Sequence, residues 1–439
     1  MSYTLSGRLG RLHPSGLAGW QRQALLLVAF VLLAAPLVGF RAVNDKPLSI
    51  FDEWQYADRV HAVTQGNVFM NDGELISEWG EIARACRGIE RVGPATNCRP
   101  APGTTASTPN YAASDPAPYS VATGLGSSVL LRLDIVDSPV IAGRLVGVLW
   151  AGLSMWTLWL LARAFGAGRP AAGVAASAVL LVPAFLQQYI HMTPHALDIP
   201  VGAFTALATL KFLRREWPIW VLPLAALTIV GVKGSNIVIA VAVGIALAAV
   251  VVWPGTFERR DRLRALVGGV VLTVSTVAFF AAFQAYLSAT RVADYEPPGQ
   301  YVVPELNRQQ VAIDSLRFLA PFGEGPLMVP AAWLVLAMAG TAMAAWAGVV
   351  PGLSPYVRQV APGYLLGAAL GAVVLDVMVF VTTDQYIGVQ LRYGLAVLPL
   401  GLAFAALLLR TRTAVVLALA ALLLYAALPA LLSLDTVAS

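Results

Sequence analysis

The chain has few charged residues. Asp, Glu, Lys and Arg make up 12% of its 439 residues, hydrophobic residues make up 58%, and the mean hydropathy is +0.71. So small a polar fraction cannot cover a globular core of this length, which excludes a water-soluble protein. The sequence therefore predicts an all-α polytopic membrane protein, with residues 1–439 forming one transmembrane domain in the lipid bilayer. The net charge of +5 does not indicate a nucleic-acid partner, because the basic residues cluster at the ends of apolar stretches.

The chain also lacks the short motifs of several common enzyme classes. It contains no GxxxxGKS, GxSxG, HExxH or CxxC segment, so nucleotide hydrolysis, serine hydrolysis and zinc protease chemistry have no support. The only two cysteines, Cys86 and Cys98, lie in the polar interval after the first apolar stretch. An oxidising compartment outside the cytoplasm favours a disulfide between them, and free buried thiols are the alternative. Two cysteines without a nearby histidine pair are too few for a zinc site.

Long apolar runs dominate what remains. A membrane-spanning helix needs about 20 apolar residues, and about eleven stretches qualify. The first is too long for a secretory signal and lacks a small-x-small cleavage site, so we expect a retained helix. The interval 218–254 is divided in two at the glycine-bracketed break 231–236. The predicted spans are 22–43, 139–162, 170–190, 196–213, 218–232, 236–254, 265–287, 326–349, 360–381, 393–409 and 413–433.

Basic residues close to spans mark the cytoplasmic side. Arg8, Arg11 and Arg22 place the N-terminus inside, and alternation then places residues 44–138, the first loop, outside the cell membrane. The loop 288–325 and the C-terminus fall outside as well. The basic residues predicted to lie inside are Arg163, Arg169, Lys211, Arg214, Arg215, Arg259, Arg260, Arg262, Arg264, Arg358, Arg410 and Arg412. The sequence thus predicts a multi-pass plasma membrane protein.

An acidic pair, Asp52 and Glu53, opens the first loop and begins a predicted amphipathic helix along the membrane surface, residues 51–61. Asp52 and Tyr56 are four residues apart and share a face. Asp52 and Glu53 point about 100° apart, so at most one of them can aim into a given pocket. The pair is a candidate for catalysis, and the alternative is a solvated helix start with acids at the positive end of the dipole.

Three basic residues lie on the predicted outer side, where topology does not require them: Arg144, Lys233 and Arg392. Charges at such depth usually face a protein interior or a polar cavity, and guanidinium and ammonium groups suit a phosphate. The alternatives are pairing of Arg144 with Asp134 or Asp137, and a Lys233 side chain that reaches the surface. If the spans converge, the three form one basic cup.

The segment between the third and fourth spans carries two of the four histidines, His191 and His195, followed by Asp198. Their i, i+4 and i+7 spacing would suit a metal ion on a continuous helix, but Pro194 interrupts that helix. A polar lining for a sugar is the favoured interpretation, with packing or solvation as the alternative. The loop 288–325 has the aromatic and charged residues of a possible lid. The candidate substrate-binding residues are Tyr56, His191, His195, Asp198, Asn236 and Gln390.

Taken in order, these features resemble the GT-C superfamily of polytopic glycosyltransferases. The resemblance covers nearly the whole chain by topology. It implies a donor sugar on a polyprenyl phosphate, an acceptor that is a cell-envelope glycan, glycolipid or glycoprotein, and a first-loop acid as catalytic base. The alanine- and valine-rich spans also look actinobacterial, which suggests a pentose such as arabinofuranose, or mannose. The resemblance rests on Asp52-Glu53, Arg144, Pro194-His195-Ala196-Leu197-Asp198, Lys233 and Val389-Gln390-Leu391-Arg392-Tyr393.

The resemblance implies a division of roles. Asp52 is the expected general base, with Glu53 as its partner or as a group that positions the acceptor. Arg144, Lys233 and Arg392 are expected to bind the donor phosphate. The sequence identifies no certain cofactor and is silent on metal dependence, because the first-loop acids could equally hold a divalent cation against the phosphate. A flippase for lipid-linked sugars and an oligosaccharide polymerase or ligase are the rival functions.

Overall fold

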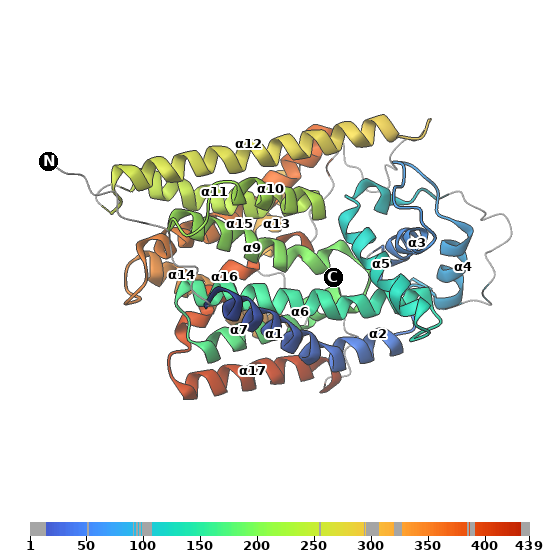
Figure 1. Ribbon diagram of the computed structural model, residues 1–439, viewed down its shortest axis with the longest axis horizontal. Helices are drawn as coiled ribbons and strands as arrows, with labels where there is room; N and C mark the ends of the chain where they lie inside the picture. Colours follow the sequence, from blue (N-terminus) through green and yellow to red (C-terminus); the bar gives the residue numbers. More distant parts are fainter. Residues whose placement is uncertain are drawn as a thin grey trace.

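The computed structural model is a helical bundle with a smaller helical cap at one end (Figure 1). The structure describes residues 15–50, 52–90, 92, 93, 95, 98, 108–253, 256–293, 295, 307–319, 327–383, 386 and 391–431. Within these residues the regular structure is helical, and the β-type pairing is limited to isolated bridges such as that between Leu48 and Ile89. The predicted all-α fold class is confirmed.

Eight helical segments in the described part of the chain are long and apolar enough to cross a membrane, and a ninth results if one bent pair counts as a span. The chain is therefore a polytopic membrane protein. Each segment falls where hydropathy predicts a span. The eight are Gly19–Asn44, Pro139–Phe165, Pro194–Leu213, Gly234–Val252, Arg259–Thr290, Val329–Trp346, Pro355–Val381 and Arg412–Ala430. The helices that form them are α1 (Ser15–Ala34), η1 (Ala35–Gly39), α2 (Phe40–Asn44), α6 (Pro139–Phe165), η3 (Pro194–Leu197), α9 (Asp198–Leu213), η4 (Gly234–Asn236), α11 (Ile237–Val252), α12 (Arg259–Thr290), α14 (Met328–Trp346), α15 (Pro355–Thr383) and α17 (Arg412–Leu431).

The other three expected spans are irregular. The third consists of α7 (Arg169–Leu181) and α8 (Pro183–Ile190), which are bent by 64°. The extended Val182 lies between them, because a residue before proline disfavours the helical conformation. The fifth and tenth are short helices, α10 (Val221–Val232) and α16 with η7 (Leu398–Leu408). The count of eleven spans therefore stays a prediction.

The break expected at 231–236 is present. Helix α10 ends at Val232, Lys233 is extended with φ −162° and ψ 138°, and a short 3₁₀ turn leads into α11. The chain therefore changes direction at Lys233, between α10 and α11. This break brings a charged side chain to the capped end of the bundle.

The cap is built from the first loop. Its elements are α3 (Glu53–Thr64), α4 (Glu78–Arg87), η2 (Tyr111–Ser114) and α5 (Pro118–Arg132), which gather at one end of the long helices (Figure 1). Whether the acidic helix lies along the membrane surface stays a prediction, but the structure places it inside the cap. Eight of the 12 residues of α3 are buried, since α4, α5 and α6 pack around it.

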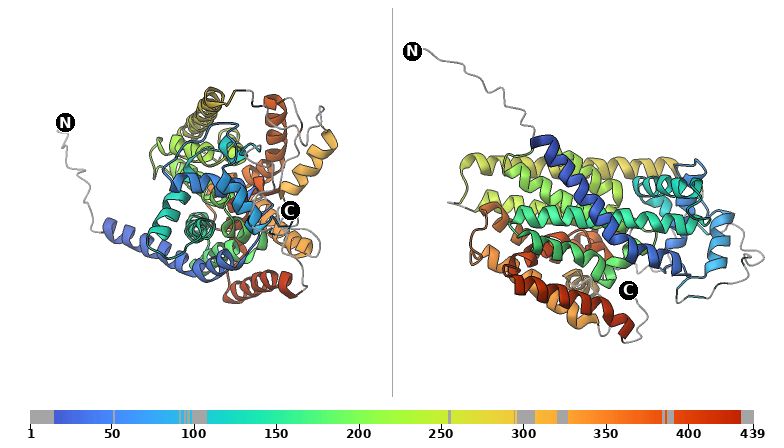
Figure 2. Two further views of the ribbon diagram at one scale, coloured as in Figure 1. Left: turned by 90° about the vertical axis from the view of Figure 1, so that its right-hand side faces the viewer. Right: turned by 60° about the horizontal axis from the view of Figure 1, so that its bottom comes forward.

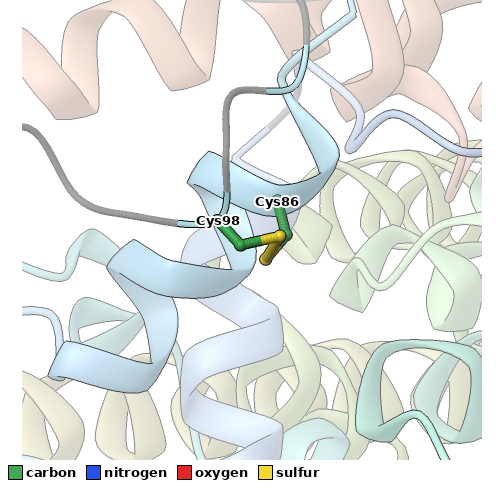
Figure 3. Close-up of a disulfide and its surroundings, with 2 residues drawn as sticks. All are labelled: Cys86 and Cys98. Atoms are coloured by element: carbon green, nitrogen blue, oxygen red, sulfur yellow. A yellow bond between two sulfur atoms is a disulfide. The ribbon is translucent and has the colours of Figure 1, made fainter.

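A disulfide closes part of the cap. Cys86, near the end of α4, is bonded to Cys98 across 12 residues of sequence (Figure 3), so the predicted pairing is confirmed. Two hydrogen-bonded contacts also tie the end of α12 to the cap: Arg291 Nε donates to Asp72 Oδ2 at 2.8 Å, and the Val292 amide donates to the Asp72 carbonyl at 2.8 Å.

The basic residues predicted to be cytoplasmic gather at the opposite end of the bundle. The Arg214 guanidinium donates to the Ala164 carbonyl and to Ser354 Oγ, and Arg264 donates to the Phe212 carbonyl. These contacts join the ends of α6 and α9 to the starts of α12 and α15. The helix α6 separates them from the cap by its full 27 residues. The charge asymmetry expected from sequence therefore exists in the fold.

The helices on the outside of the bundle expose apolar surface. In the most apolar stretches of the first and last spans only 11% of residues are buried, whereas 83% are buried in the stretch that includes α9. Figures 1 and 2 show α1, α12 and α17 at the periphery. Such surface suits lipid contact, and α9 forms the centre of the bundle.

Part of the predicted lid region is described. Its residues 288–293 belong to or follow α12, and residues 308–319 form α13 (Arg308–Leu319), which packs against α15 and the short turn η6 (Leu391–Gly394). Helix α13 therefore neighbours the segment that carries Arg392. Whether the region moves as a lid stays a prediction.

Candidate functional site

Asp52 holds an unusual backbone position. It precedes α3 with φ 59° and ψ 18°, the left-handed region that non-glycine residues rarely occupy and that Asp and Asn tolerate best. Its side chain is 47% exposed. Burial raises the pKa of its carboxyl above the ordinary 3.8, while the charges of Arg392 and Lys233 act to lower it. The result is a carboxyl that is open to solvent on one side and less acidic than usual.

Lys233 reaches the same place from the α10–α11 break. Its Nζ donates to Asp115 Oδ2 at 2.8 Å and to the Tyr56 hydroxyl at 3.1 Å. The Tyr56 hydroxyl itself donates to Asp115 Oδ2 at 2.6 Å, because burial raises the pKa of the phenol and keeps its proton in place. Asp52 and Tyr56 share a side of the helix start, as predicted, since Lys233 interacts with both.

Arg392 completes the cluster. Its Nη2 lies 3.6 Å from Asp52 Oδ2. Its Cζ lies 5.9 Å from the ring centre of Tyr393, and Lys233 Nζ lies 6.0 Å from the same centre. Two of the three predicted phosphate-binding cations thus converge beside the half-exposed Asp52, and both lie near the ring of Tyr393.

A buried pair of a histidine and an aspartate, His195 and Asp198, lies near these cations. His195 Nδ1 is 2.6 Å from Asp198 Oδ2, and the imidazole stacks on Tyr393 with ring centres 5.4 Å apart. Asn236 lies beside Asp198. In the part of the chain that the structure describes, His195 Nε2, Asp198 Oδ1 and both amide atoms of Asn236 have no hydrogen-bond partner. These three predicted substrate-binding residues are therefore together, but they are buried below the open part of the cluster.

Glu53 and Asp52 have different surroundings, because Glu53 is the first residue of α3 whereas Asp52 precedes the helix with a left-handed backbone. Its side chain is fully buried and accepts hydrogen bonds from Arg144 Nε at 2.7 Å and Nη2 at 2.8 Å. It also accepts from the Ser49 amide at 2.7 Å and the Met192 amide at 3.1 Å. A carboxylate with four donors of this kind holds structure together and has no free edge for a substrate.

The expectation that Arg144 binds a phosphate does not fit its surroundings. Arg144 is fully buried, and besides Glu53 its guanidinium donates to the carbonyls of Asp45 and Pro47. A phosphate would have to displace Glu53 to reach it. The alternative pairing with nearby aspartates is also not seen, because the partner is Glu53, 91 residues away in sequence.

His191 belongs to the Glu53 side. Its Nδ1 lies 3.0 Å from Glu53 Oε2, so it does not converge with His195. No group of three or more His, Cys, Asp or Glu side chains within the described ranges is close enough to hold a metal ion. Gln390 lies outside the described residues.

Sequence reasoning missed one member of the cluster, Asp115. It sits in a polar stretch of the first loop, between η2 and α5, where no periodicity or motif distinguishes it. The sequence contains only a weak signal for Asp115. It is an acidic residue before a proline, on the same predicted outer side of the membrane as Lys233, which has no acidic residue close in sequence.

We compared the chain with known proteins by family model and by sequence. No protein-family model matches it, and no curated protein matches it by sequence. The geometry of the cluster therefore carries the functional argument.

Proposed function

We propose that the chain is a membrane glycosyltransferase that transfers a sugar from a polyprenyl-phosphate donor to a hydroxyl of a cell-envelope glycan, glycolipid or glycoprotein on the extracytoplasmic side. One observation carries the proposal. A half-exposed carboxyl, Asp52, lies beside two cations, Lys233 and Arg392, at one end of a bundle with an apolar exterior. A lipid-linked phosphate and a water-borne hydroxyl can meet only at such an end.

The chemistry needs a base and a phosphate site, and the cluster has groups for both. Asp52 takes the proton of the acceptor hydroxyl as the oxygen forms a bond to the anomeric carbon, and the bond from that carbon to the phosphate oxygen breaks. The phosphate leaves as the lipid monophosphate, with one more negative charge. Lys233 and Arg392 stabilise this charge. A single displacement by one carboxylate-activated hydroxyl inverts the anomeric centre.

Charge bookkeeping supports this arrangement. Asp52, Asp115, Lys233 and Arg392 sum to zero when all are ionised, because two carboxylates face two cations. Proton transfer to Asp52 makes the group more positive by one charge as the phosphate becomes more negative by one. The total charge of the site therefore stays constant through the reaction, which avoids the cost of isolating a new charge near the membrane.

Glu53 and Arg144 have a different part in this proposal. Their ion pair fixes the start of α3, and Asp52 is the residue directly before it. We assign them to positioning the base rather than to the phosphate. The donor sugar, a pentose such as arabinofuranose or mannose, remains an expectation from the resemblance to GT-C enzymes.

The test is transfer by the purified protein in lipid nanodiscs, with a synthetic polyprenyl-phosphate pentose or mannose and a set of glycan acceptors. Asp52→Asn removes the base but suits the left-handed backbone, so the protein should fold and bind donor while the rate falls by about 100-fold or more. Asp134→Asn is the matched control, because Asp134 is also left-handed, with φ 51°, and exposed.

Undiminished transfer by the Asp52→Asn protein contradicts the assignment of the base. Movement of the labelled lipid across a liposome membrane without any glycosylated product contradicts the proposed activity and identifies a transporter. Transfer of preassembled oligosaccharide chains in preference to single sugars indicates a polymerase or ligase.

A further inference from the structure

The position of Asp115 is fixed from two sides by the cap. The buried Arg59 donates from Nη1 to the carbonyl of Ala112 and to that of Asp115, the latter at 2.6 Å. Asn110 Oδ1 accepts the Ala112 amide at 3.0 Å. These contacts hold the turn before Asp115 at its backbone, so the carboxylate extends from a rigid support although it belongs to no long helix.

The side chain of Asp115 makes its contacts within the candidate site. A single oxygen, Oδ2, accepts from the Tyr56 hydroxyl at 2.6 Å and from Lys233 Nζ at 2.8 Å, and Lys233 also donates to Tyr56 at 3.1 Å. The three groups form a closed hydrogen-bonded triangle from three segments of the chain. In sequence, 118 residues separate Asp115 from Lys233.

The triangle restricts what Lys233 can do. An ammonium has three N–H donors, and two of them are occupied by Asp115 and Tyr56. The Lys233 side chain is 10% exposed. Because a lysine side chain has many rotamers, holding it in one of them costs conformational entropy. A pre-oriented lysine has already lost that freedom before a ligand arrives.

We propose that Asp115 is a positioning residue, which together with the Tyr56 hydroxyl holds the Lys233 ammonium so that its one remaining N–H serves the phosphate of a lipid-linked donor. This inference rests on the proposed function and adds a residue to it. Asp115 does not touch the reacting atoms; it acts through Lys233. Its negative charge also acts on Asp52, whose pKa it helps to raise.

The test is a double-mutant cycle on binding of a synthetic polyprenyl phosphate without sugar, measured with the full chain in nanodiscs. Asp115→Ala should weaken binding about 10-fold, since Lys233 loses its main partner. Lys233→Met should weaken it at least as much. In the Lys233→Met background, Asp115→Ala should change binding by less than about 2-fold, because the residue it positions is gone.

Asp137→Ala is the matched control. Asp137 is an exposed acid at the same end of the bundle, so its removal changes net charge by the same amount without touching Lys233. It should leave binding unchanged in both backgrounds. If Asp115→Ala does not fold, Asp115→Asn and Tyr56→Phe test the same contacts, and the expected losses are about 3-fold each.

Equal losses from Asp115→Ala with and without Lys233 overturn the inference, because they mean that the two residues act independently. So does unchanged binding in the single variant. A second readout separates positioning from a purely structural role: Asp115→Asn should move the acid limb of the pH–rate profile to lower pH, since a negative neighbour of Asp52 is removed. If the protein binds lipid phosphate with the expected coupling but transfers no sugar, the proposed function fails and the role of Asp115 stands.

Discussion

The buried ion pair between Glu53 and Arg144 leads to a prediction that does not depend on any substrate. Glu53→Gln preserves the shape of the side chain but removes its charge. Arg144 then keeps its positive charge in a fully buried position, with an amide where it had a carboxylate at 2.7 and 2.8 Å. Removal of one partner from a buried ion pair costs about 3–5 kcal/mol.

The Ser49 and Met192 amides, which donate to the same carboxylate, make the upper half of that range the better expectation, since they lose a charged acceptor. Asp45→Asn is the comparison. It breaks the pair between Arg41 and Asp45, whose side chains are 30% and 25% exposed, and a pair so placed contributes about 0–1 kcal/mol. The expected difference between the two variants is therefore about 3–5 kcal/mol.

The assay is unfolding in mixed micelles with increasing sodium dodecyl sulfate, followed by tryptophan fluorescence and extrapolated linearly. The pH dependence adds a check of sign. Burial alone would raise the pKa of Glu53, but the charges and hydrogen bonds of Arg144 and His191 more than offset it and hold the pKa below its ordinary 4.5. The contribution of Glu53 is therefore complete above pH 4.5 and decreases below it as the unfolded chain takes up the proton.

The gap in stability between wild type and Glu53→Gln should thus be constant from about pH 8 to 5 and shrink in more acidic solution. A Glu53→Gln protein that is no less stable than Asp45→Asn refutes the structural role of the pair. It would mean that Arg144 does not depend on Glu53 as its partner, and the role in phosphate binding that the sequence predicts for Arg144 would again be the better interpretation.

Two further predictions follow from the site's surroundings. Gly202→Ala should destabilise the protein by about 1–3 kcal/mol or more, because a Cβ there would lie 1.8 Å from the Ala396 carbonyl; Gly173→Ala, with nothing within 4 Å, should be neutral or stabilising in the same unfolding assay, and equal effects would contradict the packing. Arg392→Gln should move the acid limb of the pH–rate profile to higher pH, because Arg392 lowers the pKa of Asp52; a limb that stays or moves to lower pH contradicts the pairing.

The sequence predicts the helices well because each membrane-spanning helix must satisfy its backbone hydrogen bonds within its own segment and must itself be apolar. Each apolar run is apparent without knowledge of its neighbours. The bend at Pro183 and the break before Lys233 are visible for the same reason, since proline and glycine act on their own backbone. The lengths of α10 and α16 were less predictable, because helices inside a bundle can be shorter than the bilayer is thick when other helices cover their ends.

Ion pairs between residues far apart in the sequence could not be predicted in this way. The sequence offered Asp134 and Asp137 as partners of Arg144 because they lie within ten residues of it, whereas Glu53 lies 91 residues away. Helix geometry predicts that the side chains of Asp52 and Glu53 diverge if both are helical, but Asp52 precedes the helix with a left-handed backbone. The sequence also could not decide which of the two would be buried, because that depends on where α6 and the segment after α8 pack against the start of α3.

The two neighbouring carboxylates thus differ in exposure, because Glu53 is buried and Asp52 is half-exposed. This difference bears on the proposed function. A helix that needs only a start can use a serine or aspartate cap in the ordinary extended conformation. Here the residue before α3 is instead left-handed and makes no side-chain cap hydrogen bond, which costs about 1 kcal/mol or more. The next residue, Glu53, is held by its buried ion pair with Arg144. Strain of this kind persists where the surrounding structure over-determines it, and such sites are often functional. At this position Asp52 lies against Arg392 and near Lys233 and does not cap its own helix, which is the arrangement that the proposed role as a general base requires.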